Sequence, residues 1–296
     1  MIASSVTLHA RHPDFRAALP AYAYLLISGR DFLLAIPGYL TESTGMNNLG
    51  SGCDSRISSK DIVVVIPAYK TQLNEVEKSV LRQCLRVLEN YDICWIHPVA
   101  LDLSPHQEII PQAQATAFDN HYFRNIEGYN KLLISKRFYQ RFARYKYMLI
   151  HQTDAWVFED SLLMWCDKGY DFVGAPWLEK PTPMGRPLLW DFTKLCVNQV
   201  GNGGLSLRRV ATCQRIAGLL KPISWFYRYN EDVFWSLFVP LIFRSFKKPS
   251  CLDALHFAFE YNPRESYQRI GNHLPFGCHA WERTDREFWN QFIYLR

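Results

Sequence analysis

Acidic side chains stand at two points of the sequence where a folded chain can use them for chemistry. Asp154 closes a polar segment that follows the apolar run 147–150, a pattern typical of a buried strand. Ligands of open α/β sheets collect outside the carboxyl ends of the strands, so a carboxylate there is suited to hold a metal ion or a sugar hydroxyl. Glu231 and Asp232 form a second acidic site, at the predicted start of a helix. A glycoside hydrolase also uses two carboxylates, one as its acid and the other as its base or nucleophile.

Each acidic site also has a purely structural interpretation. Asp154 precedes the segment 156–168, which is predicted to be helical, and aspartate is a common helix N-cap. Acids in the first turn stabilise a helix through its dipole, and this effect alone can explain why Glu231 and Asp232 stand at a helix start. A carboxylate at a helix start can be tuned either way, because the dipole favours its anion and burial favours its acid form. The sequence leaves both interpretations open.

A glycine cluster and a histidine complete the candidate residues. The segment 201–204, Gly-Asn-Gly-Gly, is not followed by Lys-Ser or Lys-Thr, so it is not a P-loop. Glycines without a side chain let the backbone approach a ligand closely. His279 lies in the turn-like, aromatic segment 274–281, where it is either a hydrogen-bonded structural residue or a ligand.

The elements that must position these residues follow a β-α-β pattern. Short apolar runs predict buried strands, and apolar residues at helical spacing predict helices between them. A strand, a helix with Asn74 as its N-cap and a second strand in succession are the unit of a doubly wound α/β sheet. The strands are predicted at 61–66, 93–96, 147–150 and 171–174, with a further short strand in the segment 198–207, which also contains a Gly-rich turn. The helices are predicted at 74–90, 118–144, 156–168, 210–220 and from 230 onward.

The first 58 residues differ from the rest of the 296-residue chain. They show no clear periodicity and lead into a Ser-, Thr-, Gly- and Asn-rich stretch at 41–59, which is typical of a linker. We therefore expect an N-terminal extension over 1–58 and a single main domain over 59–296. Eight scattered cysteines without a CxxC pair favour a reducing cytoplasm over a zinc site or a disulfide framework. The sequence has no uninterrupted run of about 18 apolar residues, so we expect no membrane span.

The excess positive charge lies in one region of the sequence. The formal net charge is +5, and the segment 206–250 has eight Lys and Arg against two acids. Aromatic residues, among them Trp225, are interleaved with these charges, a composition that suits peripheral contact with the inner face of a membrane. A solvated helix face is the plainer interpretation. Nucleic-acid binding is not expected, because no recognition motif accompanies the basic stretch.

Six short motifs follow one another along residues 60–281. They are PAYK after the first strand, QTDAW after the strand at 147–150, and then GAPW, GNGGLSLR, NEDVFW and PFGCHAW. This order resembles that of nucleotide-sugar-dependent glycosyltransferases of the GT-A fold, and more closely a little-characterised group of bacterial glycosyltransferase-like domains. The resemblance implies a GT-A-like, Rossmann-like α/β domain with a mixed, mostly parallel sheet flanked by helices.

The resemblance implies a donor site for a nucleotide-sugar. Asp154 matches the last acid of the family's Asp-x-Asp motif, which holds Mn²⁺ or Mg²⁺ on the donor diphosphate, whereas Gln152 replaces the first acid and departs from the pattern. His279 is implied as a further metal ligand, and an imidazole ligand would favour Mn²⁺. The remaining implied donor contacts are Pro67, Ala68, Tyr69, Gly203, Gly204 and Arg208, the last being either a diphosphate partner or a solvated helix residue.

The resemblance also implies a catalytic base and an acceptor site. Asp232, or Glu231 beside it, would remove the proton from the acceptor hydroxyl, which favours inversion. Trp177 and Asn202 are the implied acceptor contacts. The predicted function is transfer of a sugar to a hydroxyl of a glycan or lipid-linked glycan, as in surface polysaccharide synthesis. Two alternatives remain: a glycoside hydrolase that uses the same carboxylates and, because of Gln152, a module that binds nucleotide-sugar or carbohydrate without turnover.

Overall fold

A six-stranded sheet built around a fully buried strand forms the centre of the fold. The computed structural model describes residues 56–179, 193–225, 227 and 229–295. In it the β-branched run after Asp61 forms β1 (Ile62–Pro67), whose six residues are all buried, as expected for a strand covered on both faces. Residues 1–55 lie outside the described part of the chain, so the division into an extension and a main domain stays a prediction.

The sheet is mixed and mostly parallel. Its strand order is β3-β2-β1-β4-β7-β6, and β1 pairs in parallel with both β2 and β4. β7 runs antiparallel to its two neighbours. The strands are β1, β2 (Asp92–Pro98), β3 (Gln114–Phe118), β4 (Tyr147–His151), β6 (Phe172–Gly174) and β7 (Leu205–Arg209). The predicted α/β class, with a mixed, mostly parallel sheet flanked by helices, is confirmed.

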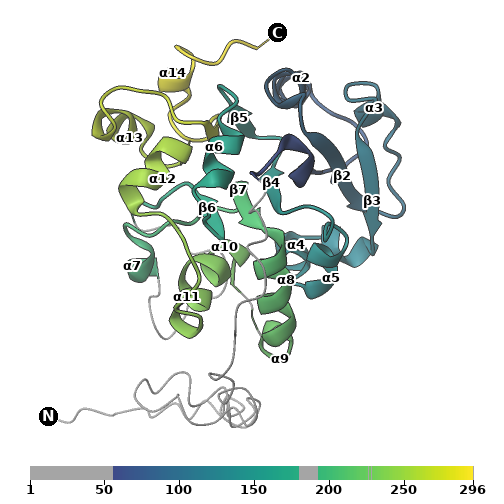
Figure 1. Ribbon diagram of the computed structural model, residues 1–296. Coiled ribbons are helices and arrows are strands. Elements are labelled where there is room, and N and C mark those ends of the chain that lie inside the picture. The colour runs from purple at the N-terminus through teal and green to yellow at the C-terminus, as the bar shows by residue number, and fades with distance from the viewer. Residues whose placement is uncertain (1–55, 180–192, 226, 228, 296) are drawn as a thin grey trace, which may run out of the picture. The chain divides into compact units, whose positions relative to one another are not determined.

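Helices cover both faces of this sheet (Figure 1). Alternate residues of β1 point to opposite faces, so Val64 belongs to a core with α2, α6 and α12, and Val65 to a core with α4, α5 and α8. The helices from α2 to α8 are α2 (Glu75–Leu88), α3 (Ser104–Gln107), α4 (Ile126–Leu133), α5 (Lys136–Gln140), α6 (Leu162–Asp167), α7 (Thr193–Cys196) and α8 (Val210–Leu219). The later helices are α9 (Lys221–Ser224), α10 (Glu231–Val233), α11 (Val239–Ile242), α12 (Cys251–Phe257), α13 (Pro263–Arg269) and α14 (Arg286–Trp289). None of the described helices is long and apolar enough to cross a membrane.

A second, three-stranded sheet joins the end of the chain to its middle. β5 (Ala155–Val157) pairs antiparallel with β9 (Gly277–His279), which pairs in parallel with β8 (Ala258–Phe259). An aromatic core that includes Trp156, Trp281 and Trp289 packs around it. Because Ala155 lies opposite His279, this small sheet brings the C-terminal histidine to the segment that carries Asp154.

Most of the predicted elements are present, but two predicted helices are wrong in part. α2 has the predicted N-cap, since the Asn74 side chain accepts a hydrogen bond from the Glu77 N–H. The predicted helix at 156–168 begins instead as strand β5, and α6 starts only at Leu162. The predicted helix at 118–144 is divided into a short 3-10 turn, α4 and α5, and β3 was missed before it. β5 is set by its pairing with β9 and β3 by its pairing with β2, and local periodicity reports neither pairing.

Candidate active site

The candidate residues meet at the carboxyl edge of the parallel strands. β1 ends at Pro67, which Ala68 and Tyr69 follow, and β4 ends at His151, next to Gln152. The antiparallel strand β7 starts at this same edge, because His151 at the end of β4 pairs with Leu205 at the beginning of β7. The glycine segment 201–204 therefore lies beside the end of β4, and the Gln152 N–H donates to the Gly204 carbonyl at 2.9 Å.

Three polar side chains surround the His279 ring, and we call Gln152, Asp154, Glu260 and His279 the His279 cluster. The Nε2 atom of His279 lies 3.1 Å from Oδ1 of Asp154 and 3.2 Å from Oε1 of Gln152. Its Nδ1 atom lies 3.2 Å from Oε1 of Glu260. The other carboxylate oxygen of Asp154, Oδ2, lies 2.9 Å from Nη2 of the exposed Arg283. The alternative that Asp154 caps a helix is wrong, because α6 begins after Ser161.

The backbone after His279 takes an unusual conformation that serves this arrangement. Ala280 has φ of 51°, in the left-handed region that a residue with a Cβ rarely adopts. Its N–H donates to the carbonyl of Asp154 at 3.0 Å, and its own carbonyl accepts from the N–H of Arg283. The turn thus presents His279 and Arg283 to the two carboxylate oxygens of Asp154.

The charges in the His279 cluster favour an imidazolium between carboxylates. Burial by itself lowers the pKa of His279, but hydrogen bonds and charge interactions with Asp154 and Glu260 outweigh it and raise that pKa to about 10. Burial raises the pKa of Asp154, and the hydrogen bond and charge of His279 outweigh this effect, so the net shift is downward. The acid at this point is therefore held ionised.

A second group of charged residues, Arg208, Glu231 and Asp232, is called here the Glu231 group. Oε1 of Glu231 lies 2.8 Å from Nη2 of Arg208, and both side chains are almost completely buried. The other Glu231 oxygen, Oε2, is buried without a hydrogen-bond partner among the described residues. Arg208 also donates to the hydroxyls of Ser206 and Tyr139. A fixed ion pair thus supports the start of α10.

Asp232 is the titratable member of the Glu231 group near neutral pH. Burial and then the negative charge of Glu231 raise its pKa from 3.8 to about 7, although the Val233 N–H lowers it. The charge of Glu260 also contributes to the rise. Asp232 is therefore within electrostatic range of the His279 cluster.

Three consecutive residues of the glycine segment each contact one acid or imidazole of the site. The Asn202 side chain donates to Glu260 through Nδ2, and its Oδ1 accepts from the Gly204 N–H at 2.9 Å. A Cβ on Gly203 would lie 1.7 Å from Oε1 of Glu231. A Cβ on Gly204 would lie 2.0 Å from Nε2 of His279. These glycines are thus required by protein side chains, whereas the sequence had suggested that they make room for a ligand.

Several predicted ligand contacts are not available in the described arrangement. Arg208 has no exposed surface and lies on β7, so its interpretation as a solvated helix residue is wrong and a direct diphosphate contact does not fit. Trp177 is 3% exposed and packs on Gly201, where a Cβ would meet its ring at 2.1 Å. Asn202 is 6% exposed and bonded to Glu260. Trp177 and Asn202, the two predicted acceptor contacts, are therefore buried residues that hold the glycine segment and Glu260 in place.

Tyr69 does face solvent. It is 41% exposed, while Pro67 and Ala68 before it are buried. Its ring meets those of Tyr129 and Phe123 edge-on, with centroids 5.4 and 6.1 Å apart. It borders a shallow hollow of about 240 Å³ at the ends of β1, β2 and β3. The other lining residues are Pro98, Ala100, Leu101, Asn120, Phe123 and Arg124.

Sequence reasoning missed Glu260, which belongs to the His279 cluster, and Arg283, which contacts Asp154 from outside the cluster. Glu260 follows the buried residues 257–259, so it shows the same signal as Asp154: a carboxylate at the end of an apolar run. Arg283 carries no comparable signal, because it is an exposed residue in a loop and its partner Asp154 is 129 residues away in sequence.

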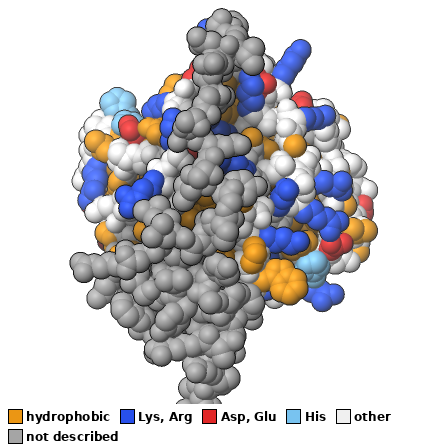
Figure 2. Space-filling model, turned by 60° about the horizontal axis from the view of Figure 1, so that its bottom comes forward, with side chains coloured by type: hydrophobic (Ala, Val, Ile, Leu, Met, Phe, Trp, Pro, Cys, Tyr) orange, Lys and Arg blue, Asp and Glu red, His pale blue; other side chains and the backbone are white. Residues whose placement is uncertain are grey.

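The basic stretch 206–250 does not place all of its charge at the surface. Arg208 is buried, and the Nζ atom of Lys248 donates to the carbonyl of Ser236 at 2.6 Å. Trp225 is 76% exposed, whereas Phe226 and Arg228 lie outside the described residues. In the areas of Figure 2 that are coloured by side-chain type, Lys and Arg side chains are scattered over the face with hydrophobic side chains among them. Contact with a membrane stays a prediction.

The chain belongs to the family described as "Protein of unknown function (DUF5672)", whose model matches residues 112–279. No curated protein matches it. Membership of a bacterial glycosyltransferase-like group stays a prediction.

Similar solved structures include glycosyltransferases at low identity. Core-mannan synthase A (CmsA/Ktr4) from Aspergillus fumigatus, in its Mn/GDP form, is 10% identical, with a TM-score of 0.44 over 64% of this chain and 71% of that one. Galactosyltransferase LgtC, in complex with donor and acceptor sugar analogs, is 12% identical, with a TM-score of 0.42 over 78% and 100%. The 4-diphosphocytidyl-2C-methyl-D-erythritol synthase from Anaerococcus prevotii is 10% identical, with a TM-score of 0.39 over 60% and 81%. At these values the likeness does not bear on activity.

Proposed function

We propose that the protein is a glycosyltransferase that moves a sugar from a nucleotide-sugar to a hydroxyl acceptor, with metal assistance and inversion at the anomeric carbon. One observation carries the proposal: the segment 202–204 contacts both the aspartate–histidine cluster and Glu231, and the next residue after Glu231, Asp232, has its pKa raised to about 7. A donor diphosphate and an acceptor hydroxyl need these two environments side by side. The six motifs of the sequence give the same expectation.

The His279 cluster fits a divalent cation. Oδ1 of Asp154, Oε1 of Gln152 and Nε2 of His279 converge, and Glu260 on Nδ1 is the partner that orients a metal-bound imidazole. His279 would release its Nε2 proton to solvent on binding the ion, because only the neutral imidazole ligates a metal. Among the described residues no three His, Cys, Asp or Glu side chains form a ready-made metal group, so the Gln152 amide would supply the third ligand. Such a mixed oxygen and nitrogen set suits Mn²⁺ better than Mg²⁺. When bound, the ion would neutralise charge on the leaving diphosphate.

The hollow beside Tyr69 is the proposed place of the donor nucleotide. An exposed aromatic ring can stack on a base, and Arg124 at the rim can meet a phosphate. The hollow lies at the carboxyl ends of three parallel strands, the edge at which α/β sheets bind ligands. With the nucleotide in this hollow, the donor sugar would point toward Asp154, which follows the end of β4.

Asp232 is the proposed base, and Glu231 is a positioning residue. Asp232 takes the proton from the acceptor hydroxyl while the oxygen of that hydroxyl forms a bond to the anomeric carbon of the donor sugar. The bond from that carbon to the diphosphate breaks, and the nucleoside diphosphate leaves with the electron pair. Glu231 is held by Arg208 and raises the pKa of Asp232 through its charge, which keeps the base matched to neutral pH.

The proposal is tested by a thermal-shift screen against UDP-, GDP-, CMP- and dTDP-sugars, each with and without Mn²⁺. A donor that binds the native state at a hundred times its Kd stabilises it by about 2.7 kcal/mol. We expect one donor to stabilise the protein in a Mn²⁺-dependent way, and Asp154→Ala to abolish the effect. The matched control is Asp167→Ala on α6, an exposed acid away from the cluster, which should leave the shift unchanged.

Turnover and stereochemistry are then followed by NMR with the donor so identified. Release of the nucleoside diphosphate with an inverted anomeric signal in the product is the expected result. Absence of a shift with every donor would contradict the proposal. Donor binding without transfer to any acceptor of a broad panel would leave only a non-catalytic binding module.

A further inference from the structure

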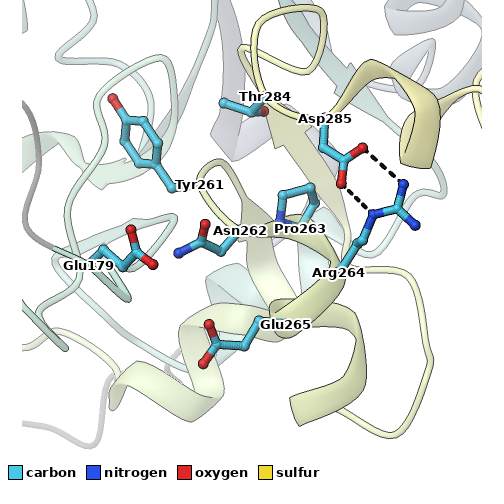
Figure 3. A pocket seen from close by; sticks show the side chains of 8 residues that line it. All are labelled: Glu179, Tyr261, Asn262, Pro263, Arg264, Glu265, Thr284 and Asp285. Atoms are coloured by element: carbon cyan, nitrogen blue, oxygen red, sulfur yellow. Dashed lines mark hydrogen bonds and ion pairs between the residues drawn. The ribbon is translucent and has the colours of Figure 1, made fainter.

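A second cavity opens beside the His279 cluster, and none of the residues that line it entered the argument above. It has a volume of about 400 Å³, within the range of small-molecule sites. Figure 3 shows Tyr261, Glu179 and Asn262 on one side and the Arg264–Asp285 pair on the other. The lining residues are Glu179, Tyr261, Asn262, Pro263, Arg264, Glu265, Thr284 and Asp285.

The walls of this cavity continue directly from the site. Tyr261 follows Glu260, which holds His279, and Thr284 follows Arg283, which holds Asp154. Burial and then the negative charges of Glu260 and Asp232 raise the pKa of the Tyr261 hydroxyl. Its ring therefore stands within electrostatic range of the proposed base.

The free polar groups of the cavity suit an uncharged polyhydroxylated ligand. Arg264 and Asp285 neutralise each other, with Nε and Nη2 at 2.5 and 3.1 Å from the two carboxylate oxygens. Glu265 is paired with Arg269. Glu179 is exposed and has no ion pair with a described residue. Its described lining residues thus present an acceptor for hydroxyl protons, and none of them is a spare cation for a phosphate.

Two further residues complete a surface of the kind that binds sugars. Tyr261 is 38% exposed, so its ring can stack on the apolar face of a pyranose. Asn262 has φ of 50°, and its Nδ2 atom is buried without a hydrogen-bond partner among the described residues. A buried donor that lacks a partner costs free energy, which a ligand hydroxyl would recover.

We propose that this cavity is the acceptor subsite and takes a neutral pyranose unit of a glycan, stacked on Tyr261 and hydrogen-bonded by Glu179 and Asn262. This rests on the proposed transferase function. It replaces Trp177 and Asn202 as acceptor contacts.

The test is saturation-transfer NMR on the full chain with the methyl glycosides of glucose, galactose, mannose, N-acetylglucosamine and glucuronic acid. We expect a neutral glycoside to bind, and Tyr261→Ala to weaken its Kd tenfold or more, while Tyr261→Phe stays within about threefold because the ring remains. Tyr294→Ala is the matched control, since Tyr294 is 68% exposed and lies outside the cavity. Thermal unfolding of each variant verifies its fold.

Charge gives a second, independent readout. The glucuronide should bind more weakly than the glucoside, and Glu179→Gln should reduce that difference, because the repulsion between two carboxylates is removed. Equal binding of the neutral glycoside by wild type and Tyr261→Ala overturns the proposal. So does its displacement by the nucleotide-sugar, since the cavity would then be the donor's.

Failure of the acceptor subsite is distinguishable from failure of the transferase. If a donor binds through Asp154 but no glycoside binds through Tyr261, the subsite alone is wrong. If glycosides bind through Tyr261 and no donor binds, the transferase proposal falls and the acceptor role falls with it.

Discussion

The His279 cluster and the Glu231 group contain the same kind of acid in opposite electrostatic surroundings. Asp154 faces an imidazole and the Arg283 guanidinium, and its pKa is lowered. Asp232 stands beside another carboxylate, and its pKa rises to about 7. Burial favours the acid form at both places, so the neighbouring charge decides the difference.

The comparison shows how one loop can support two chemistries. An aspartate that stays ionised suits metal or diphosphate binding, whereas an aspartate that gains and loses a proton near neutral pH suits acid–base work. Two consecutive glycines contact the two groups, Gly203 packing on Glu231 and Gly204 on His279. Variants that change the residues around Asp154 or around Asp232 should therefore affect the His279 cluster and the Glu231 group separately.

The largest expected effect comes from removal of the titrating acid. Asp232→Asn should lower turnover by about 10²- to 10⁴-fold, the usual contribution of a general base, and leave donor binding within a few-fold. In wild type the same carboxyl should impose a pH limb, with turnover falling about tenfold per unit below pH 7, where Asp232 becomes protonated. Steady-state kinetics between pH 5 and 9 measure both. Turnover of Asp232→Asn close to wild type would end the role of this residue as base.

Asp232→Asn should also change the pH dependence of stability, in a direction that the raised pKa of Asp232 fixes. The pKa of Asp232 is higher in the folded than in the unfolded chain, so its contribution to the free energy of unfolding is full below about pH 4 and is lost as the pH rises to about 7. Asp232→Asn removes that loss, and its stability relative to wild type should be greater at pH 8 than at pH 4. Urea unfolding at the two pH values is the measurement.

A somewhat smaller effect is expected from breaking the ion pair under the base. Glu231→Ala leaves Arg208 charged and buried, which typically costs about 3–5 kcal/mol of stability. The double variant Glu231→Ala with Arg208→Met should regain most of this loss, because the uncompensated charge is gone. The control is Glu265→Ala, which breaks an exposed pair with Arg269 and should cost at most about 1 kcal/mol. Similar costs for the buried and exposed pairs would contradict this account of the Glu231 group.

The smallest effects should come from adding one methyl group to each glycine. Gly203→Ala and Gly204→Ala should each cost about 1–3 kcal/mol, because the new Cβ overlaps Glu231 or His279. Gly204→Ala should weaken the Mn²⁺-dependent donor shift more than Gly203→Ala, and Gly203→Ala should reduce turnover more at saturating donor. Gly218→Ala on α8 is the control, since its Cβ would meet only the flexible Lys136 side chain. Identical profiles for the two loop variants would mean that the halves of the site are not separable.

Local sequence determined three of the four parallel strands, β1, β2 and β4, and the helix α2. The run at 61–66, the capped helix from Asn74 and the run at 147–150 carry their periodicity within a few residues, and the structure has β1, α2 and β4 there. Hydrophobic burial acts on each such segment wherever it packs, so its pattern can be read without knowledge of its neighbours. The position of Asp154 after a strand followed from the same signal.

Tertiary structure alone decided the partners of the candidate residues. His279 meets Gln152 across 127 residues of sequence because β5 and β9 pair, and each of these strands has only three residues, too few to show a period. Glu260, Arg283 and the cavity at Tyr261 depend on the same pairing. The burial of Arg208 and the raised pKa of Asp232 depend on Glu231 in the fold. Residue types and apolar spacing thus indicated the elements and many of the candidate residues, whereas the charges that tune each acid come from long-range contacts that no local pattern encodes.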